Sequence, residues 1–488
     1  MNALIWFVII YWIVTILIGL SAGRLVKSSK DFALAGRSLP MYIVTATVFA
    51  TWFGAETVLG ISATFVKDGL SGIVADPFGS SMCLILVGLF FARPLYRMNL
   101  LTIGDYYKQK YGRLVEVLIT LCIVTSYLGW VAAQIKALGL VFNVVTGGAV
   151  SMETGMIIGA ASVLVYTLAG GMWSVAITDF VQMLIIVAGM LYIGWEISEM
   201  VGGAGPVIAH AREAGKFEFW PQPTPRELLW FVAAWITMMF GSIPQQDVFQ
   251  RVSSAANEKI AGRSAILGGS LYFCFAFIPI FLAYSASLID PKMFTELIDK
   301  DPQLILPTLI TTHMPLLAQV LFFGALLSAI MSSASATLLA PSVMITENIL
   351  RGIMPKQSDR QFLMSMRSVV LVFAVIVTLF ALNSESSIFH MVENAYKVTL
   401  VAAFIPLAFG MYWKHATRQG ALSAIFLGFG CWVLTEILAP EGMWPPQLVG
   451  VLASMVGMLA GSLLPQWTAR HLAAPSPGNS SGSERNPL

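Results

Sequence analysis

The chain has 488 residues, of which 57% are hydrophobic and 11% are charged, and its net charge at neutral pH is +2. Soluble domains carry about 25% charged residues, so this composition excludes a soluble globular protein and indicates a chain that crosses a membrane many times. No basic patch is concentrated enough to bind nucleic acid. The four cysteines and five histidines show no metal or catalytic-triad spacing, which disfavours an enzyme.

Apolar runs long enough to cross a bilayer follow one another along nearly the whole chain. The first run has no basic residues before it, so we predict that it is retained as a helix and not cleaved as a signal. The end of the chain, residues 471–488, is rich in Ser, Pro, Gly and Asn and is predicted to be a disordered cytoplasmic tail. We predict an all-α polytopic membrane protein with 13 transmembrane helices, over residues 3–23, 41–65, 71–95, 114–144, 152–170, 173–200, 226–244, 260–288, 315–346, 362–382, 388–413, 419–438 and 445–466.

Basic residues predict the orientation of these helices, because loops on the cytoplasmic side carry an excess of Lys and Arg. Loops on one side hold 20 of the 28 Lys and Arg residues, and loops on the other side hold 6. The two that remain, Lys136 and Lys397, fall inside predicted helices. We therefore predict a multi-pass protein of the plasma (inner) membrane with its N-terminus outside and its C-terminus in the cytoplasm.

Two predicted helices contain residues that interrupt a helical backbone: Gly54 in the stretch 50–57, and Pro244 in the stretch 240–247. Each interrupted helix opens a run of five helices. Interruptions at matching positions of two halves are typical of transporters built from inverted repeats, with a binding site at the midplane; an incidental kink is the alternative at each position. The predicted parts are an N-terminal helix and loop (1–30), a first repeat (31–200), a second repeat (201–414) and two C-terminal helices (415–470).

A stretch rich in hydroxyl groups lies inside the ninth apolar run. On a helix, Ala329, Ser332, Ser333 and Ala336 fall on one face, at positions i, i+3, i+4 and i+7. Hydroxyl oxygens suit hard cations such as Na⁺. The alternative is close helix packing through small residues, with each hydroxyl bonded to its own backbone.

Three motifs give the chain a resemblance to a known family. They are Gly36-Arg37-Ser38 before the first interrupted helix, the long run 166–182 that contains Gly170-Gly171 and Thr178-Asp179, and the run 328–333 with its serines. From about residue 31 to residue 413 the chain resembles the sodium:solute symporter family. The resemblance implies a LeuT-type inverted repeat of five plus five helices, here with one helix before it and two after it, and Na⁺ as the coupling ion.

The resemblance also implies a Na⁺ site between the first and eighth helices of the repeats. Its ligands would be the backbone carbonyls of Ala50, Phe53 and Ala329 and the hydroxyl groups of Ser332 and Ser333.

Some relatives in this family hold a second Na⁺ between an aspartate and three serines. Asp179, Ser332 and Ser335 match three of those positions, but the fourth is Ala336, so we expect one Na⁺ per solute. Asp179 is a candidate for the path by which Na⁺ leaves toward the cytoplasm, because ionisable groups within membrane helices are functional candidates by default. A capping or anchoring carboxylate is the alternative.

Polar and aromatic residues beside the two interruptions are candidate solute ligands. Glu56 and Asp76 are flanked by apolar residues, where an unpaired charge costs several kcal/mol; Lys136 is a candidate partner for them, and purely structural pairing is the alternative. The substrate-binding candidates are Trp52, Glu56, Thr57, Asp76, Trp130, Gln134, Gln245 and Gln246.

The interrupted segments look most like the choline-transporter branch of the family, in which an aromatic cage binds a quaternary ammonium group. Trp52 and Trp130 match two positions of such a cage. Gln245 stands where a third tryptophan is expected, and an aromatic residue expected near Ser80 is missing. The incomplete match favours a polar solute that carries an amine.

Together these patterns predict a Na⁺-coupled secondary active symporter that imports a small polar solute, best an amino acid such as proline, by alternating access. A symporter for choline or another quaternary amine is the first alternative, and a membrane sensor that acts through a separate signalling partner is the second. The expected partners are the solute, Na⁺ and the lipid bilayer, without nucleic acid, and the oligomeric state stays open.

Overall fold

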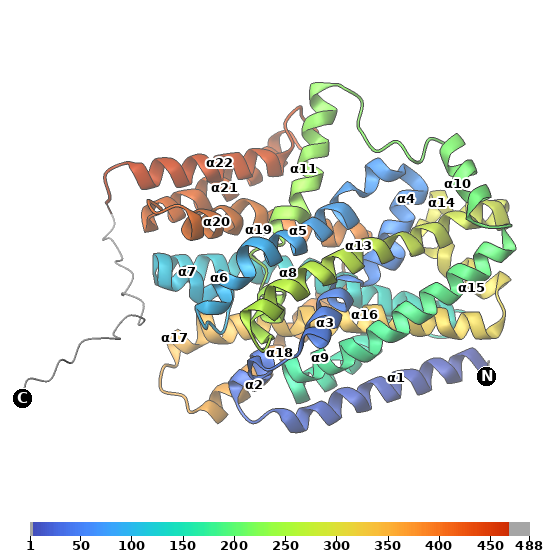
Figure 1. Ribbon diagram of the computed structural model, residues 1–488, viewed down its shortest axis with the longest axis horizontal. Helices are drawn as coiled ribbons and strands as arrows, with labels where there is room; N and C mark the ends of the chain where they lie inside the picture. Colours follow the sequence, from blue (N-terminus) through green and yellow to red (C-terminus); the bar gives the residue numbers. More distant parts are fainter. Residues whose placement is uncertain (1–2, 468–488) are drawn as a thin grey trace, which may run out of the picture.

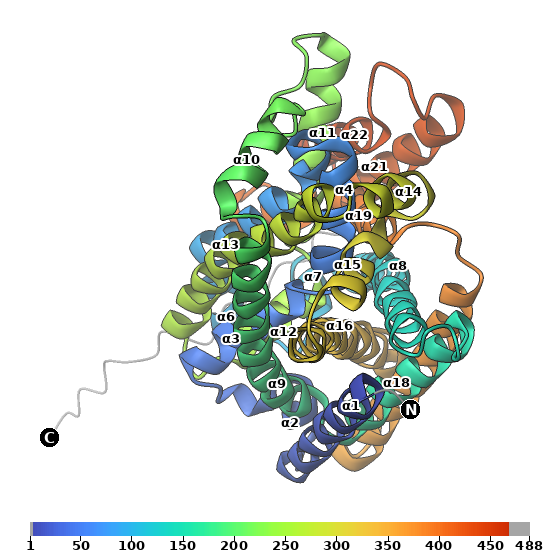
Figure 2. The same cartoon turned by 90° about the vertical axis from the view of Figure 1, so that its right-hand side faces the viewer.

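The computed structural model describes residues 3–467. Over this range the chain is helical, and its one sheet-like contact is an isolated bridge between Leu39 and Ala255. Most long helices run along the horizontal of Figure 1 and are seen nearly end-on in Figure 2, so the molecule is a bundle of roughly aligned helices. The predicted disordered tail, residues 471–488, lies outside the described residues.

The N-terminal half begins with an apolar helix at the edge of the bundle and continues into short, broken helices before two very long ones (Figure 1). Side-chain caps begin several of these helices; the Thr102 hydroxyl and the Asp105 carboxyl form a capping box on α7. The helices are α1 (Ala3–Ala22), α2 (Ser29–Leu34), α3 (Met41–Trp52), α4 (Ser62–Asp68), α5 (Ser80–Leu86), α6 (Ala92–Arg97), α7 (Ile103–Tyr111), α8 (Arg113–Val145), α9 (Met152–Met200) and α10 (Ala204–Glu213).

The C-terminal half contains a long and deeply buried helix, α16, in which every residue from 325 to 344 is buried. Figure 2 shows α16 near the middle of the bundle, with α1, α8 and α9 around it. The helices of this half are α11 (Pro225–Gly241), α12 (Gln246–Ser254), α13 (Glu258–Ile289), α14 (Pro291–Lys300), α15 (Ile305–His313), α16 (Leu316–Met344), α17 (Arg351–Ile353), α18 (Asp359–Leu382), α19 (Ile388–Thr399), α20 (Ile405–Tyr412), α21 (Arg418–Leu438) and α22 (Pro446–Leu463).

Two helices are broken where Gly54 and Pro244 predict it. The axis turns by 50° between α3 and the segment Glu56–Asp68, and by 44° between α11 and α12. Phe53, between the two parts of the first pair, has the non-helical backbone angles φ −87° and ψ 71°. A Cβ atom at Gly54 would lie 2.4 Å from the Ser333 hydroxyl oxygen, so this position has no room for a side chain.

Ten helices within residues 3–467 are long and apolar enough to cross a membrane, and the count reaches twelve if each bent pair is one span. The sequence predicts thirteen, and the difference lies in α9, which replaces the two predicted helices 152–170 and 173–200. The structure establishes the all-helical, many-span architecture and leaves the number thirteen a prediction.

The helix α9 has 49 residues, or roughly 74 Å at 1.5 Å per residue, which is more than twice the hydrocarbon thickness of a bilayer. Its backbone breaks at Gly171, where φ is 49° and ψ is −131°. On the two sides of this break, Tyr166 packs on Gly19 of α1 and Ser174 donates a hydrogen bond to the Gly19 carbonyl. A straight helix would hold those two residues about 12 Å apart, so the chain turns back at Gly171.

Candidate ion and solute site

The end of α3 has backbone groups that bond to side chains of other segments and not to its own helix. The Thr51 carbonyl accepts a hydrogen bond from the Ser333 hydroxyl at 2.6 Å, and the Trp52 carbonyl accepts one from the Thr57 hydroxyl at 3.1 Å. The amide of Ala55 donates to the side-chain oxygen of Gln134 at 3.0 Å. The break at Gly54 therefore frees backbone groups inside the bundle, where only protein can satisfy them.

The serines of α16 divide into two groups according to their partners. Ser333 bonds to α3, as described, and the Ser332 hydroxyl donates to Asp179 Oδ1 at 2.6 Å. Ser335 and Thr337 instead donate to carbonyls of their own helix, at 3.0 and 2.6 Å. The packing interpretation thus describes Ser335 and Thr337, whereas Ser332 and Ser333 join α16 to two other helices.

The predicted ion ligands lie on elements that meet. Ala50 and Phe53 are at the end of α3, Ala329 and the two serines are in the middle of α16, and all five residues are 0% exposed. The contact between Ser333 and the Thr51 carbonyl brings the two elements to hydrogen-bond distance. Hydroxyl and carbonyl oxygens in a dry interior are a donor set suited to a hard monovalent cation.

Asp179 of α9 lies between the same two helices. It accepts hydrogen bonds from Ser332 of α16 and from Thr47 of α3, and it is completely buried. Ser335, which the sequence groups with Asp179, donates to the Ser332 carbonyl one turn away. The structure therefore brings together Asp179 and Ser332 and directs the Ser335 hydroxyl to backbone.

Glu56 is at the centre of the predicted solute residues. Its Oε1 accepts from the Trp130 indole N–H at 3.1 Å, and its Oε2 accepts from the Gln134 amide at 2.5 Å. Both carboxyl oxygens of Glu56 therefore have a hydrogen-bond donor from α8. The expectation that Lys136 pairs with Glu56 or Asp76 is wrong: its ammonium donates to the carbonyls of Ser384 and Ser386, at 3.4 and 2.7 Å.

A second carboxyl cluster forms around Asp76. The Tyr272 hydroxyl donates to Asp76 Oδ1 at 2.5 Å, and Ser80 donates to the same oxygen. Tyr272 also lies 3.1 Å from the Thr57 hydroxyl, which connects this cluster to the broken segment. Sequence reasoning missed Tyr272; its signal is a tyrosine within the apolar helix α13, where a buried hydroxyl needs a partner.

Aromatic rings surround the Glu56 cluster. Trp52 stacks on Tyr396 with ring centroids 6.1 Å apart and meets Trp130 edge-on at 5.7 Å. Trp130 stacks on Tyr127 at 6.1 Å. Tyr127 and Tyr396 were not expected from the sequence. Tyr127 lies one turn before Trp130 on α8, a spacing that could have found it, whereas Tyr396 reaches the site only through the packing of α19. The aromatic wall is consequently more complete than Trp52 and Trp130 alone suggest.

The two glutamines at the second break point to different places. The Gln245 amide donates to the hydroxyls of Ser126 and Thr399, at 2.9 and 3.4 Å, so it lies between α8 and α19 beside the aromatic rings. Gln246 accepts from the Ile103 amide at 2.8 Å, at the beginning of α7. Gln246 therefore anchors a neighbouring helix and does not join the Glu56 cluster.

Two charged residues after the second break were also missed. Asp247 accepts from the Tyr127 hydroxyl at 2.5 Å, and Arg251 donates from Nε to the Thr51 hydroxyl at 3.0 Å. Both side chains are buried. A signal was present in the sequence, since an Asp and an Arg four residues apart directly follow the interrupting Pro244, but their partners on α8 and α3 cannot be read from the chain.

The predicted solute residues at the first break are buried. Trp52, Glu56, Thr57, Asp76, Trp130 and Gln134 are each at most 2% exposed. Two paired helix breaks, freed carbonyls beside hydroxyl groups, and a buried cluster of aromatic and carboxyl groups are the features expected of a membrane transporter whose site lies at the breaks.

The chain belongs to the sodium:solute symporter family, whose model matches residues 32–428; the resemblance found in the sequence is thereby confirmed, and the protein is a Na⁺-coupled solute symporter by family. It is 27% identical over 438 residues to the high-affinity choline transporter 1 of Drosophila melanogaster, covering 86% of this chain and 68% of the relative. It is 25% identical to the osmoregulated proline transporter of Bacillus subtilis, with 94% of both chains covered. A solved Na⁺-coupled sialic acid symporter in a substrate-bound outward-open state has the same fold, with a TM-score of 0.79, 20% identity, and coverage of 95% of this chain and 98% of that one.

Proposed function

We propose that the protein imports a small organic amine together with Na⁺, and that its solute is a cation of the choline type. The observation that carries this proposal is the set of rings around Glu56: Trp52, Trp130, Tyr127 and Tyr396 pack against one another beside its carboxyl group. Aromatic faces and a nearby negative charge attract a quaternary ammonium group, which offers no hydrogen bonds.

A zwitterionic amino acid such as proline is the second candidate. The relative in Bacillus subtilis is named a proline transporter, and the amide groups of Gln134 and Gln245 are hydrogen-bond donors that could meet a solute carboxylate. Against it, the Gln134 amide already donates to Glu56. An amino acid would have to displace that bond, whereas a quaternary amine would not.

The proposed ion site consists of the carbonyls of Ala50, Phe53 and Ala329 and the hydroxyls of Ser332 and Ser333. Its support is the direct contact of α3 with α16 through Ser333. A Na⁺ ion there would bridge the broken helix that also carries Trp52 and Glu56, so ion binding and solute binding would stabilise the same arrangement. Such coupling is reciprocal: the solute must raise the affinity for Na⁺ by the factor by which Na⁺ raises the affinity for the solute. We propose that Asp179 binds the ion next, on its path toward the cytoplasm.

We further propose thirteen spans, with the N-terminus outside and the C-terminus in the cytoplasm. The support is the excess of Lys and Arg on one set of loops and the turn at Gly171 in the 49-residue α9. In addition, α1 begins at the right-hand end of Figure 1 and α22 ends at the left, as an odd number of crossings requires.

Uptake into proteoliposomes tests the function. Radiolabelled choline should accumulate only with an inward Na⁺ gradient, and unlabelled proline should not compete. The charge moved per solute separates the two candidates: one Na⁺ with a choline cation carries two charges, about 4.6 kcal/mol at 100 mV, and one Na⁺ with proline carries one, about 2.3 kcal/mol. Binding of solute without uptake would instead support the sensor.

A further inference from the structure

A groove runs between α18 and the end of α16, outside the candidate transport site. Its volume is about 1170 Å³, with Val369, Val372 and Ile376 of α18 on one wall and Ile345 and Leu350 on the other. Val372 and Ile376 are 56% and 49% exposed on a helix that is long and apolar enough to span a membrane. This part of the groove therefore faces lipid chains.

One end of the groove is basic. Lys356, in the loop between α17 and α18, and Arg360, in the first turn of α18, line it. Both are exposed, and neither forms an ion pair within the described part of the chain. The carboxylate nearest in sequence, Asp359, accepts from the Ser29 hydroxyl at 2.5 Å and does not line the groove. Two basic side chains without an ion-pair partner thus lie at one end of the apolar groove. Ser365 and Ser368 line the groove between this basic end and the apolar part.

The basic end belongs to the Lys- and Arg-rich loops, whose excess of charge marks the cytoplasmic side. Anionic lipids are concentrated in the cytoplasmic leaflet, and basic pockets beside membrane helices on that side bind their head groups. A guanidinium group also matches the geometry of a phosphate with two parallel hydrogen bonds. We propose that the groove binds one anionic phospholipid, with its phosphate at Lys356 and Arg360 and an acyl chain along Val369, Val372 and Ile376.

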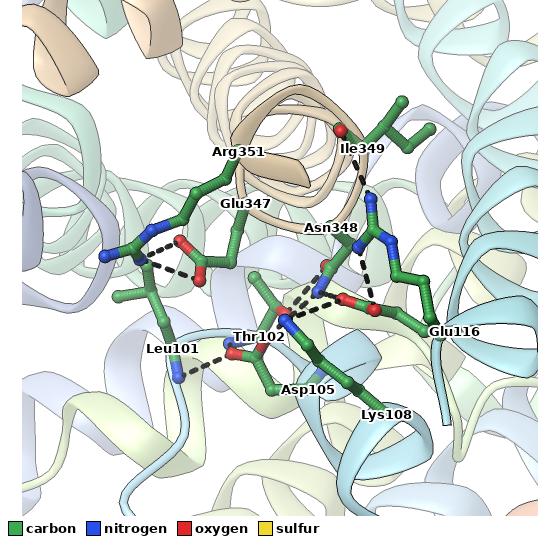
Figure 3. Close-up of polar contacts among 10 residues, drawn as sticks. Leu101, Thr102, Asp105, Lys108, Glu116, Glu347, Asn348, Ile349 and Arg351 are labelled. Atoms are coloured by element: carbon green, nitrogen blue, oxygen red, sulfur yellow. Dashed lines mark hydrogen bonds and ion pairs between the residues drawn. The ribbon is translucent and has the colours of Figure 1, made fainter. Parts of the chain in front are cut away.

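The proposed lipid lies against the continuation of the helix that carries Ser332 and Ser333. The segment Ile345–Leu350 follows α16 directly, and its other side is bonded to the N-terminal half of the chain (Figure 3). Asn348 donates to Asp105 at 3.0 Å and to Glu116 at 2.9 Å, while Glu347 pairs with Arg351 at 2.7 Å. The lipid would therefore contact a segment that links α16 to α7 and α8.

Native mass spectrometry of the full chain in detergent tests the binding, independently of any transported solute. Titration with dioleoylphosphatidylglycerol should give one tightly held lipid, and dioleoylphosphatidylcholine should give none of similar affinity. The double variant Lys356→Gln/Arg360→Gln should weaken that lipid about thirty-fold, since each basic residue near an anionic surface strengthens binding roughly fivefold. The control Lys259→Gln/Arg263→Gln has the same four-residue spacing, is exposed at the beginning of α13 away from the groove, and should change nothing.

A second pair of variants tests the apolar part without touching charge. Val372→Trp fills the groove and should displace the lipid, while Val375→Trp, which is 52% exposed on the same helix but does not line the groove, should retain it. Equal retention of the two lipids by the wild type, or equal weakening by both charge pairs, would overturn the proposal. So would displacement of the lipid by millimolar glycerol 3-phosphate, because the apolar groove would then contribute nothing.

Discussion

The hydroxyl of Ser333, in the middle of α16, donates a hydrogen bond of 2.6 Å to the backbone carbonyl of Thr51, at the end of α3. The two residues are 282 positions apart, and each is unusual for its helix: the carbonyl is beside a break, and the hydroxyl is not bonded to its own backbone. A small cation that binds between the two helices would take the Ser333 hydroxyl as a ligand in place of this bond, without unwinding either helix further.

Removing one hydroxyl should therefore weaken Na⁺ coupling. Ser333→Ala and Ser332→Ala are each expected to raise the Na⁺ concentration for half-maximal uptake about tenfold or more, because a bond to a charged group is worth about 1.5–3 kcal/mol. Uptake at varied Na⁺ measures this. Ser342→Ala is the matched control, since the Ser342 hydroxyl is buried in α16 but donates to its own helix at 2.8 Å; a similar loss there would refute the assignment.

Glu56→Gln should impair binding of a cationic solute. The substitution removes the charge and turns an amide donor toward the N–H groups of Trp130 and Gln134, which now both donate to Glu56. We expect solute affinity to fall about ten- to a hundred-fold, because the attraction between the carboxyl charge and the cation is lost. Equilibrium binding of labelled choline at saturating Na⁺ is the measurement, and Glu199→Gln, an exposed position, is the control. Unchanged affinity would show that Glu56 does not contribute to solute binding.

Trp52→Leu should weaken choline binding about thirty-fold, since a cation–π contact away from water is worth roughly 2 kcal/mol. Tyr396→Phe should have little effect, because it keeps the ring stacked on Trp52 and removes a hydroxyl that has no hydrogen-bond partner within residues 3–467. Trp195→Leu, at an indole that is 59% exposed, controls for the loss of a tryptophan. A proline transporter would give the reverse ranking, with loss of the tyrosine hydroxyl more costly than loss of the indole.

Asn348→Asp should loosen the contact of α7 and the beginning of α8 with the segment Ile345–Leu350 that follows α16. The Asn348 amide donates to both Asp105 and Glu116, and a third carboxyl group at this position would replace attraction by like-charge repulsion. Hydrogen exchange should become faster in residues 103–116 and stay unchanged in 388–399. Asn383→Asp, at an exposed helix end, should leave both regions as they are.

Acid should weaken the contacts of the Asp290 carboxyl group, which lies between α13 and α14. The Met293 amide, at 3.1 Å, and next the His313 ring, at 2.9 Å, hold the pKa of the Asp290 carboxyl below its ordinary value. A lowered pKa means that this stabilisation is present above the unfolded pKa, about 4, and is lost as the pH falls through the folded pKa. Asp290→Asn should therefore lower the melting temperature at pH 7, and the difference from wild type should disappear in acid. A difference that grows as the pH falls would contradict it.

Hydropathy and Gly or Pro punctuation were sufficient for the spans, the two breaks and the hydroxyl-bearing face of α16. These features depend on neighbours within a few residues, since the bilayer imposes helix wherever an apolar run is long enough. The sequence predicts that Trp52, Glu56, Trp130 and Gln134 lie near one another only because the breaks indicate where a site can form.

The amino-acid sequence by itself determined a many-span transporter with paired interruptions and a candidate ion helix. Only the tertiary structure decided which groups meet: Tyr127, Tyr272 and Tyr396 joined the site, Lys136 turned away to the carbonyls of Ser384 and Ser386, and Gln246 bonded to Ile103. Except for Tyr127, which lies one turn from Trp130, these groups meet partners far away in the sequence through the packing of whole helices. The spacing of residues within one segment does not predict this packing. It predicts which residues share a helix face, but not which residues of another helix that face contacts.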